Sequence, residues 1–229
     1  MKFCHKVFHL DKDTDRAGYV KDINTYLLDH SKLLYTPTIG ISCQEEYDDF
    51  VSNNKDFPID PQGYNLNNIQ GWKYGEVGIW ASNFLAYKNF LNTDSDYLIL
   101  MEDDILFDEG YMPKLKEYIQ ELPEDWDLFS YFVPKDQKVK YQNHHDIEKP
   151  NVCYSYQDWS MLCYVINKRS AQKILDEMQK GFNLPLDWYF YRQTNIFKCY
   201  TVKPWVTIGC TLASIESTFQ TKENRKILS

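Results

Sequence analysis

The sequence lacks long apolar runs, a leader-like start and paired cysteines. No apolar run approaches the roughly 20 residues that a membrane-spanning helix needs, so we expect no membrane span. Residues 1–10 alternate Lys and His with apolar side chains, unlike a secretory signal. The six cysteines form no CxxC pair, which argues against a zinc ribbon. Together these absences predict a cytoplasmic protein whose cysteines are free thiols.

The chain also has no excess of basic charge. Its 25 Lys and Arg are outnumbered by 33 Asp and Glu, for a net charge of -8. Duplex nucleic acid needs a basic face, so we expect no nucleic-acid partner. Residues 93–127 hold 12 of the acids and 2 Lys, which leaves the remainder of the chain at +2. The acidity therefore belongs to one stretch, and the rest of the chain can accept an anionic ligand.

Size and composition favour one globular domain. The 229 residues are 43% hydrophobic, which is enough to bury a sizeable core. No internal repeat and no break in composition divides the chain. We therefore expect a single domain over residues 1–212, followed by a polar tail over residues 213–229.

Apolar runs of strand length alternate with segments of helical periodicity, and the alternation predicts an α/β/α sandwich around a mostly parallel sheet. Gly75 is expected just before a helix, and Ser170 is expected to cap another. Strands are expected at residues 3–10, 38–42, 97–101, 128–133, 161–166 and 199–202. Helices are expected at residues 17–28, 44–53, 76–92, 111–122, 170–180 and 185–197, with irregular chain at 55–71 and 134–156.

The strongest chemical feature is a run of three carboxylates, Glu102, Asp103 and Asp104, directly after the apolar run YLILM. In open α/β sheets, ligands bind beyond the carboxyl ends of strands. Adjacent carboxylates repel one another, and a hard divalent cation such as Mn²⁺ or Mg²⁺ relieves this. Strand alternation lets Glu102 and Asp104 share one side. The alternative is a solvated acidic turn, but apolar sequence on both sides favours the metal site.

Six segments in order, from residue 9 to residue 187, carry a further pattern. They are HLD with TDR at residues 9–16, GEVGI with a following Ser at 75–82, LILMEDDILF at 98–107, LP with DWD at 122–127, CYVI with a following Ala at 163–171, and LPLD at 184–187. In order and spacing they resemble the motifs of glycosyltransferase family 25, which builds lipopolysaccharide and collagen glycans. The chain departs from the family's pattern at His9, where Asn is usual, and at Asn83, where His often follows the Ser.

The resemblance implies a GT-A fold and a nucleotide-sugar donor, with a UDP-sugar expected. It also implies a carboxylate motif that binds Mn²⁺ or Mg²⁺ at the donor diphosphate. Family members of this kind transfer a hexose with inversion to a hydroxyl of a glycan or glycoconjugate acceptor. Donor contacts are carried over to the matching positions of this chain, which are His9, Leu10, Asp11, Arg16, Gly75, Glu76, Ser82, Glu102 and Asp103.

Transfer from a nucleotide-sugar needs a neutralised leaving group, a base for the acceptor hydroxyl and in-line positioning. We expect Asp104 to hold the metal, with Glu102 or Asp103 assisting. The planar guanidinium of Arg16 is suited to a phosphate, although a surface position at a helix start is an equal alternative. At Gly75 and at the neighbouring Gly78 the backbone can approach the donor closely.

Asp187 is the preferred base, because its apolar neighbours would raise the pKa of its carboxyl group. The alternative for Asp187 is a helix N-cap. Asp158 is the second candidate base. Sugar-stacking candidates are Trp72, Tyr74, Trp159 and Trp188, although core packing is the better expectation for any one of them. A run of His144, His145 and Asp146 resembles a metal triad, but a solvated loop is the preferred interpretation.

Two other functions compete with transfer. A metal-dependent phosphohydrolase or nuclease also gathers carboxylates at a strand end, but it needs acids from several segments. A sugar-binding relative without turnover is the third possibility, and the intact acidic run weighs against it. The donor sugar, the acceptor and the linkage have no readable motif in the sequence.

Overall fold

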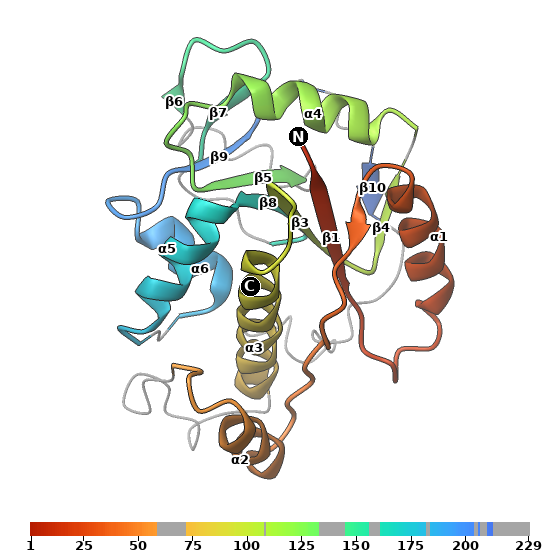
Figure 1. Ribbon diagram of the computed structural model, residues 1–229, viewed down its shortest axis with the longest axis vertical. Coiled ribbons are helices and arrows are strands. Elements are labelled where there is room, and N and C mark those ends of the chain that lie inside the picture. Colours follow the sequence, from red (N-terminus) through yellow and green to blue (C-terminus); the bar gives the residue numbers. More distant parts are fainter. Residues whose placement is uncertain are drawn as a thin grey trace, which may run out of the picture.

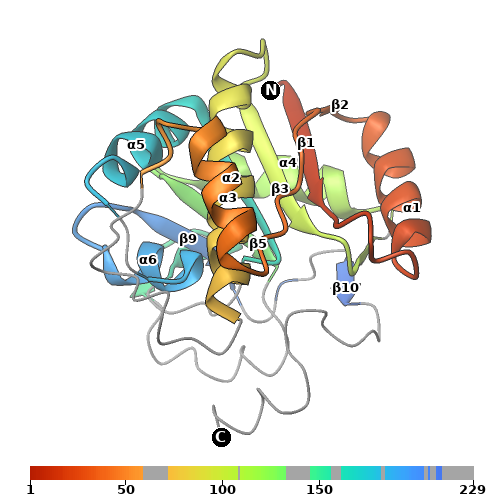
Figure 2. The same ribbon diagram turned by 90° about the horizontal axis from the view of Figure 1, so that it is seen from below.

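The computed structural model describes residues 1–58, 72–107, 109–132, 145–155, 161–181, 184–203, 206 and 210–212. These residues form an α/β sandwich in which helices cover both faces of a central sheet (Figure 1, Figure 2). The fold class expected from the sequence is therefore confirmed. No helix among the described residues is long and apolar enough to cross a membrane.

The central sheet has eight strands and is mixed in direction. β1 pairs in parallel with β2 and β3, and β5 pairs in parallel with β9, whereas β8 and β7 run against their neighbours. The expected parallel arrangement thus holds for six strands and fails at two. A strand buried on both faces has the same apolar pattern in either direction, so the pattern does not encode this reversal. In spatial order the strands are β2 (Lys32–Leu33), β1 (Phe3–Phe8), β3 (Tyr97–Glu102), β8 (Cys163–Asn167), β5 (Leu128–Phe132), β9 (Cys199–Val202), β7 (Val152–Tyr154) and β6 (His145–Asp146).

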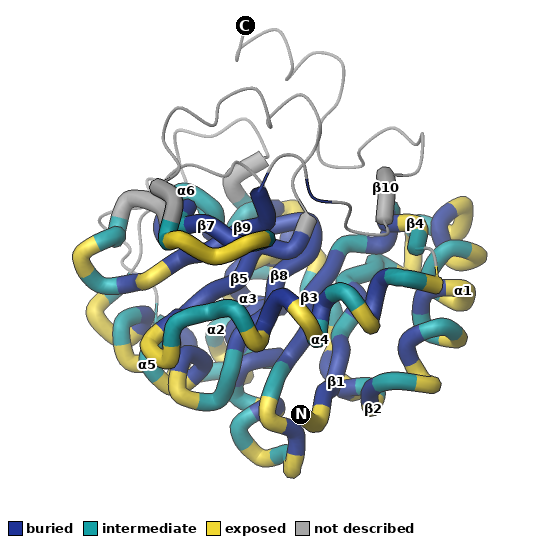
Figure 3. The backbone as a smooth tube through the Cα atoms, turned by 90° about the horizontal axis from the view of Figure 1, so that it is seen from above, coloured by how far each residue is buried: buried dark blue, intermediate teal, exposed yellow. Residues whose placement is uncertain are grey.

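The two faces of the sheet carry separate cores. In β3, Leu98 and Leu100 face one core, while Ile99 and Met101 face the other, as strand alternation requires. The first core is closed by α2 (Gln44–Asn53), α3 (Trp72–Leu91), α5 (Lys168–Met178) and α6 (Leu186–Arg192). The second core is closed by α1 (Ala17–Leu28) and α4 (Tyr111–Glu121). The inner strands are buried almost throughout, and exposed positions concentrate on helices and loops (Figure 3).

A second, two-stranded sheet adjoins the acidic run. It pairs β4 (Ile105–Phe107) antiparallel with β10 (Cys210–Leu212). The apolar residues that follow the three carboxylates are therefore a strand, which the sequence pattern did not separate from β3. β6 and β7 were also missed, because they lie in the polar segment 134–156, where short edge strands show little periodicity.

Residues 38–42 are not a strand, contrary to expectation. The segment instead lies against α3, where Ile39 N donates to Ser82 Oγ at 2.8 Å. A short apolar run cannot show by itself whether it pairs in a sheet or packs against a helix.

Two helix starts also differ from expectation. α5 begins at Lys168, and its cap is Asn167, whose side chain accepts from Ser170 N. Gly75 is buried inside α3 and does not precede it. Most of segment 55–71 and the tail 213–229 lie outside the described residues. The single domain over residues 1–212 therefore stays a prediction.

Candidate active site

The parallel pairing of β1 and β3 places the site. In their register Phe8 lies opposite Glu102, so the chain leaves both strands at the same edge of the sheet. The loop after β1 then lies beside the acidic run, although the two are more than 80 residues apart in sequence. This edge is the carboxyl end of β3, where ligands of open α/β sheets bind.

Asp103 is engaged by protein groups on both of its oxygens. His9 Nδ1 lies 2.7 Å from Oδ2, and a terminal nitrogen of Arg16 donates to Oδ1 at 2.7 Å. Asp103 is 5% exposed and Arg16 is 4% exposed. Asp103 is thus buried and paired with the Arg16 guanidinium, which also lies away from solvent. The alternative of a surface position for Arg16 is therefore wrong, and its expected phosphate contact stays a prediction.

Glu102 and Asp104 have a different environment. Burial, together with the charges of Asp104 and Asp103, raises the pKa of Glu102 to about 8, although Arg16 opposes the shift. Burial also raises the pKa of Asp104, while Arg16 opposes that shift. The environment of these two carboxylates therefore disfavours their ionised forms unless a cation binds next to them.

A divalent cation fits this pair. Oδ1 of Asp104 is buried and has no hydrogen-bond partner among the described residues. Hard carboxylate oxygens suit Mg²⁺ or Mn²⁺, and Mg²⁺ in particular is often held by one or two carboxylates plus substrate phosphates. Within the described ranges no three or more His, Cys, Asp or Glu side chains gather as a metal cage. The residues therefore fit a cation that is bound by two protein carboxylates and by a substrate diphosphate.

Asp187 belongs to the same site. It lies in the first turn of α6, and its negative charge contributes to the raised pKa of Glu102. Burial raises the pKa of Asp187 itself, although Trp188 N donates to its Oδ1 at 2.9 Å. The N-cap position of α6 is Pro185, so the alternative role of Asp187 as a cap is wrong. Asp158, the second candidate base, lies outside the described residues.

Comparison with known proteins gives a family for the chain. A sequence model described as glycosyltransferase family 25 (LPS biosynthesis protein) matches residues 66–190, more than half of the chain. The chain belongs to glycosyltransferase family 25. The matched segment includes the acidic run and Asp187, and it ends before β9. His9 and Arg16 lie before it.

Two curated relatives are named procollagen galactosyltransferase 2. The mouse protein is 26% identical over 176 residues, which are 68% of this chain and 26% of that protein. The human protein is 31% identical over 124 residues, which are 49% of this chain and 18% of that protein. The aligned part thus spans about a quarter or less of the length of these relatives.

Solved glycosyltransferases are similar at the level of coordinates. One is involved in glycosylation of the major capsid of PBCV-1, with 10% identity, a TM-score of 0.47, and coverage of 90% of this chain and 84% of that one. Another is a Drosophila β1,4-galactosyltransferase 7 in complex with manganese, UDP-Gal and xylobiose. It has 10% identity, a TM-score of 0.43, and coverage of 99% and 78%.

Several family motif positions have packing roles in this family 25 chain. Ser82 is 2% exposed, accepts from Ile39 N and donates to Gly78 O at 2.8 Å. Its hydroxyl is therefore engaged inside the fold, and its expected donor contact stays a prediction. At Gly78 a Cβ would lie 2.6 Å from Ile39 O, so this glycine allows the close approach of the neighbouring backbone. Gly75 and the half-buried Glu76 lie in α3.

The first motif surrounds the loop after β1. Leu10 O accepts from Asp13 N at 2.8 Å, which turns the chain toward α1. Asp11 is exposed, and its charge partly offsets the lowering of the Lys6 pKa by burial. Both lie next to His9, and their expected donor contacts stay predictions.

Asn83, where the family often has His, belongs to a buried hydrogen-bond network. Tyr164 donates its hydroxyl to Asn83 Oδ1, and the Tyr87 and Tyr164 hydroxyls lie 2.7 Å apart. Nδ2 of Asn83 donates to Ile79 O. The departure from the motif therefore supplies a polar partner between α3 and β8.

The remaining candidates are dispersed. Tyr74 donates its hydroxyl to Gln44 at 3.0 Å, and Trp188 is half-buried beside Asp187. His145 and Asp146 form β6, at the far edge of the sheet from β3. The side chain of Trp72, with Trp159 and His144, falls outside the described part of the chain.

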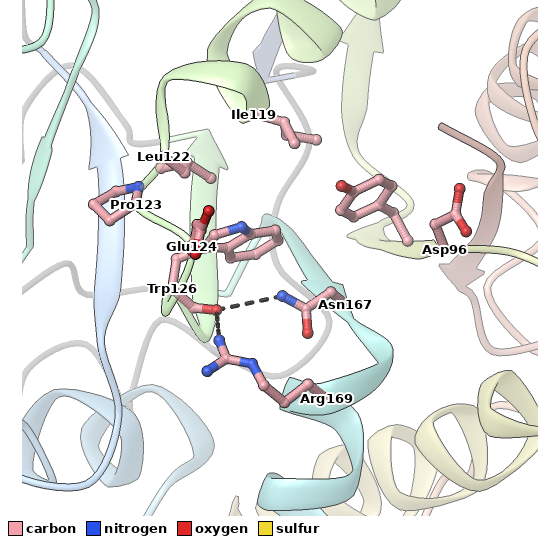
Figure 4. A pocket seen from close by; sticks show the side chains of 9 residues that line it. Asp96, Ile119, Leu122, Pro123, Glu124, Trp126, Asn167 and Arg169 are labelled. Atoms are coloured by element: carbon pink, nitrogen blue, oxygen red, sulfur yellow. Dashed lines mark hydrogen bonds between the residues drawn. The ribbon is translucent and has the colours of Figure 1, made fainter.

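A separate pocket of about 490 Å³ lies at the opposite end of β3 (Figure 4). It includes Tyr97 at the start of the strand and Trp126, whose carbonyl accepts from Asn167 and Arg169. Trp126 is 5% exposed, so its ring is largely covered by its neighbours. The pocket shares no residue with the acidic site.

Proposed function

We propose that this chain is a divalent-cation-dependent, inverting glycosyltransferase. It would move a hexose from a UDP-sugar to a hydroxyl of a glycan or glycoconjugate. The observation that carries the proposal is the crowding of Glu102, Asp104 and Asp187 at the carboxyl end of β3. Family membership supports the reaction class, and the galactosyltransferase name of the two relatives supports galactose as the transferred hexose.

Glu102 and Asp104 would hold Mn²⁺ or Mg²⁺ together with the donor diphosphate. When bound, the cation neutralises charge on the leaving diphosphate as a Lewis acid. Because the pKa of Glu102 is raised, Glu102 and Asp104 together carry less than two negative charges near neutral pH when no cation is bound. The pair therefore accepts the cation most readily where both carboxylates are ionised.

Asp187 would act as the base. Inversion in one step requires a group that takes the proton of the acceptor hydroxyl as it attacks the anomeric carbon. Trp188 N holds Oδ1 of Asp187, so the acceptor proton would go to Oδ2. A raised pKa makes this carboxylate a stronger base than a solvated one.

A cytoplasmic location is part of the proposal. Cys4, Cys43 and Cys163 are free thiols, which is the state that a reducing compartment favours.

A donor panel tests the function. UDP-hexoses are incubated with a mixed glycan and glycopeptide acceptor pool, with Mn²⁺ or with EDTA, and both UDP release and product mass are recorded. We expect a hexose mass increment with one donor and loss of turnover in EDTA. An equal rate of UDP release with Mn²⁺ and with EDTA would exclude the role of the cation. Inorganic phosphate or UMP as product would indicate the phosphohydrolase, and binding without turnover would indicate the sugar-binding relative.

A further inference from the structure

We infer that Asp103 is a positioning residue, held by Arg16 and His9, that aims Glu102 and Asp104 at the donor. These three side chains are called the Asp103 anchor. The inference rests on the proposed function and divides the acidic run by role: one carboxylate fastens the turn and two serve the ligand.

The first support is the saturation of Asp103. Each of its oxygens has its own charged or polar partner at 2.7 Å, one from the loop after β1 and one from the start of α1. By contrast, Oδ1 of Asp104 is buried without a hydrogen bond among the described residues. The carboxylate with partners is thus the middle one, and its two neighbours are left for a ligand.

The second support is the loop between β1 and α1, which places Arg16 next to Asp103. Asp13 N donates to Leu10 O and Arg16 N donates to Asp13 O, so the loop turns twice before α1 begins. Arg16 occupies the N-cap position of α1 and makes no side-chain cap bond there. Its planar guanidinium is directed to Asp103, a geometry that suits a carboxylate.

The third support is a second contact between α1 and the chain just beyond the acidic run. Tyr26 of α1 stacks on Phe107 of β4 with ring centroids 5.7 Å apart. Ile105, between Asp104 and Phe107, is fully buried in the same core as Ile23 of α1. The start of α1 therefore holds the turn through the ion pair between Arg16 and Asp103. The body of α1 holds β4 through packing.

The turn gives the anchor its consequence. Glu102 ends β3, and Asp103 and Asp104 form the turn that leads to β4. Fixing Asp103 on the α1 side therefore fixes this turn, and with it the positions of Glu102 before and Asp104 after the anchored residue. Outer groups that orient metal-binding carboxylates commonly affect metal affinity by about 10–100-fold. The first motif and the acidic run thereby form one unit, and Arg16 acts through Asp103.

A double-variant cycle tests this inference. Arg16→Met, Asp103→Asn and their combination are compared with wild type for Mn²⁺ affinity at saturating UDP, followed by the EPR signal of free Mn²⁺. UDP affinity in EDTA is measured by calorimetry. We expect each single variant to weaken Mn²⁺ binding about tenfold, and the double variant to stay within about twofold of the weaker single. Metal-free UDP affinity should change by less than about twofold.

The opposite pattern would overturn the inference. If Arg16 contacts phosphate directly, Arg16→Met weakens metal-free UDP binding and its effect multiplies with that of Asp103→Asn. Unchanged Mn²⁺ affinity in Asp103→Asn would also overturn it. If wild type itself binds neither UDP nor Mn²⁺, the proposed function fails before the anchor is tested. The two failures are therefore distinguishable.

Controls separate positioning from stability. Lys173→Met removes the ammonium group 2.6 Å from the buried Asp127, which lies just before β5 and outside the acidic site. It should lower the midpoint of thermal unfolding without changing Mn²⁺ affinity. Should Arg16→Met fail to fold, Arg16→Lys and His9→Ala test the inference in its place, since each weakens one of the two contacts of Asp103. We expect both to reduce Mn²⁺ affinity less than Asp103→Asn, and unchanged affinity in both would refute the anchor.

Discussion

Gly78 of α3 lies directly against Ile39, so that a Cβ at this position would come within 2.6 Å of the Ile39 carbonyl oxygen. Backbone cannot yield as a flexible side chain would. Ser82, one turn later, accepts the Ile39 N–H and holds the same segment in place. The two family motif residues thus form a single packing contact between a helix and the chain after β2.

Gly78→Ala should destabilise the protein. The clash with backbone costs about 1–3 kcal/mol, partly offset by the helix propensity of Ala. Gly18→Ala in α1 is the matched control, because nothing lies within 4 Å of its added Cβ. It should stabilise by about 0.5–1 kcal/mol. Urea denaturation of the pair checks both signs, and equal effects would show that Gly78 is not a contact glycine.

His5 should make stability fall in acid. It is fully buried beside Ser31 and Asn24, and burial lowers its pKa from 6.5 to about 4. Between pH 6.5 and about pH 4, His5 therefore binds a proton in the unfolded chain but not in the folded chain. Stability from this group is complete above pH 6.5 and is lost as the pH falls toward 4, by about 3 kcal/mol.

Urea denaturation from pH 7 to pH 4 measures this loss. His5→Gln should be less stable at pH 7 but should show a shallower decline with acid than wild type. His30→Gln is the control for removing a histidine elsewhere, and it should keep the wild-type slope. Parallel slopes for wild type and His5→Gln would refute the assignment.

Asp104→Asn should weaken cation binding. Losing a ligand costs at least as much as losing an outer partner, so Mn²⁺ affinity at saturating UDP should fall by more than about tenfold. Titration with Mn²⁺ followed by EPR measures the change. Asp94→Asn is the control, since Asp94 is exposed and pairs with Lys2 and Lys32 outside the site. Equal affinity in the two variants would remove Asp104 from the cation site.

Asp187→Asn should separate binding from chemistry. The amide keeps the shape of the side chain but cannot take the acceptor proton, so kcat should fall by about 10²–10⁴-fold. UDP and Mn²⁺ affinities should stay close to wild type. Steady-state rates with the active donor, together with calorimetry for UDP, give both quantities. Full turnover in this variant would exclude Asp187 as the base.

The sequence was most informative where local patterns suffice. The 12-residue helix α1 and the 10-residue helix α2 begin and end at the residues expected from the sequence. The strand YLILM and the acidic residues after it were recognised, because a buried strand requires an unbroken apolar run. Family membership followed from motifs spread along the chain and is confirmed.

Strand direction and short strands were not accessible in this way. β8 runs antiparallel to β3, yet its pattern of buried residues resembles that of a parallel strand. The pairing of β4 with β10 joins residues about 100 positions apart, and neither strand exceeds three residues. Such elements depend on distant partners, which no local window contains.

By itself the sequence determined that three carboxylates follow a buried strand and that a cation would suit them. Only the tertiary structure decided how the three divide. His9 and Arg16 meet Asp103 across sequence separations of 94 and 87 residues, and this contact satisfies one carboxylate and leaves two. Asp187 reaches the same site from α6. Spacing along the chain predicts which side chains share a strand or helix face, whereas the partner that neutralises a buried charge is set by the pairing of β1 with β3.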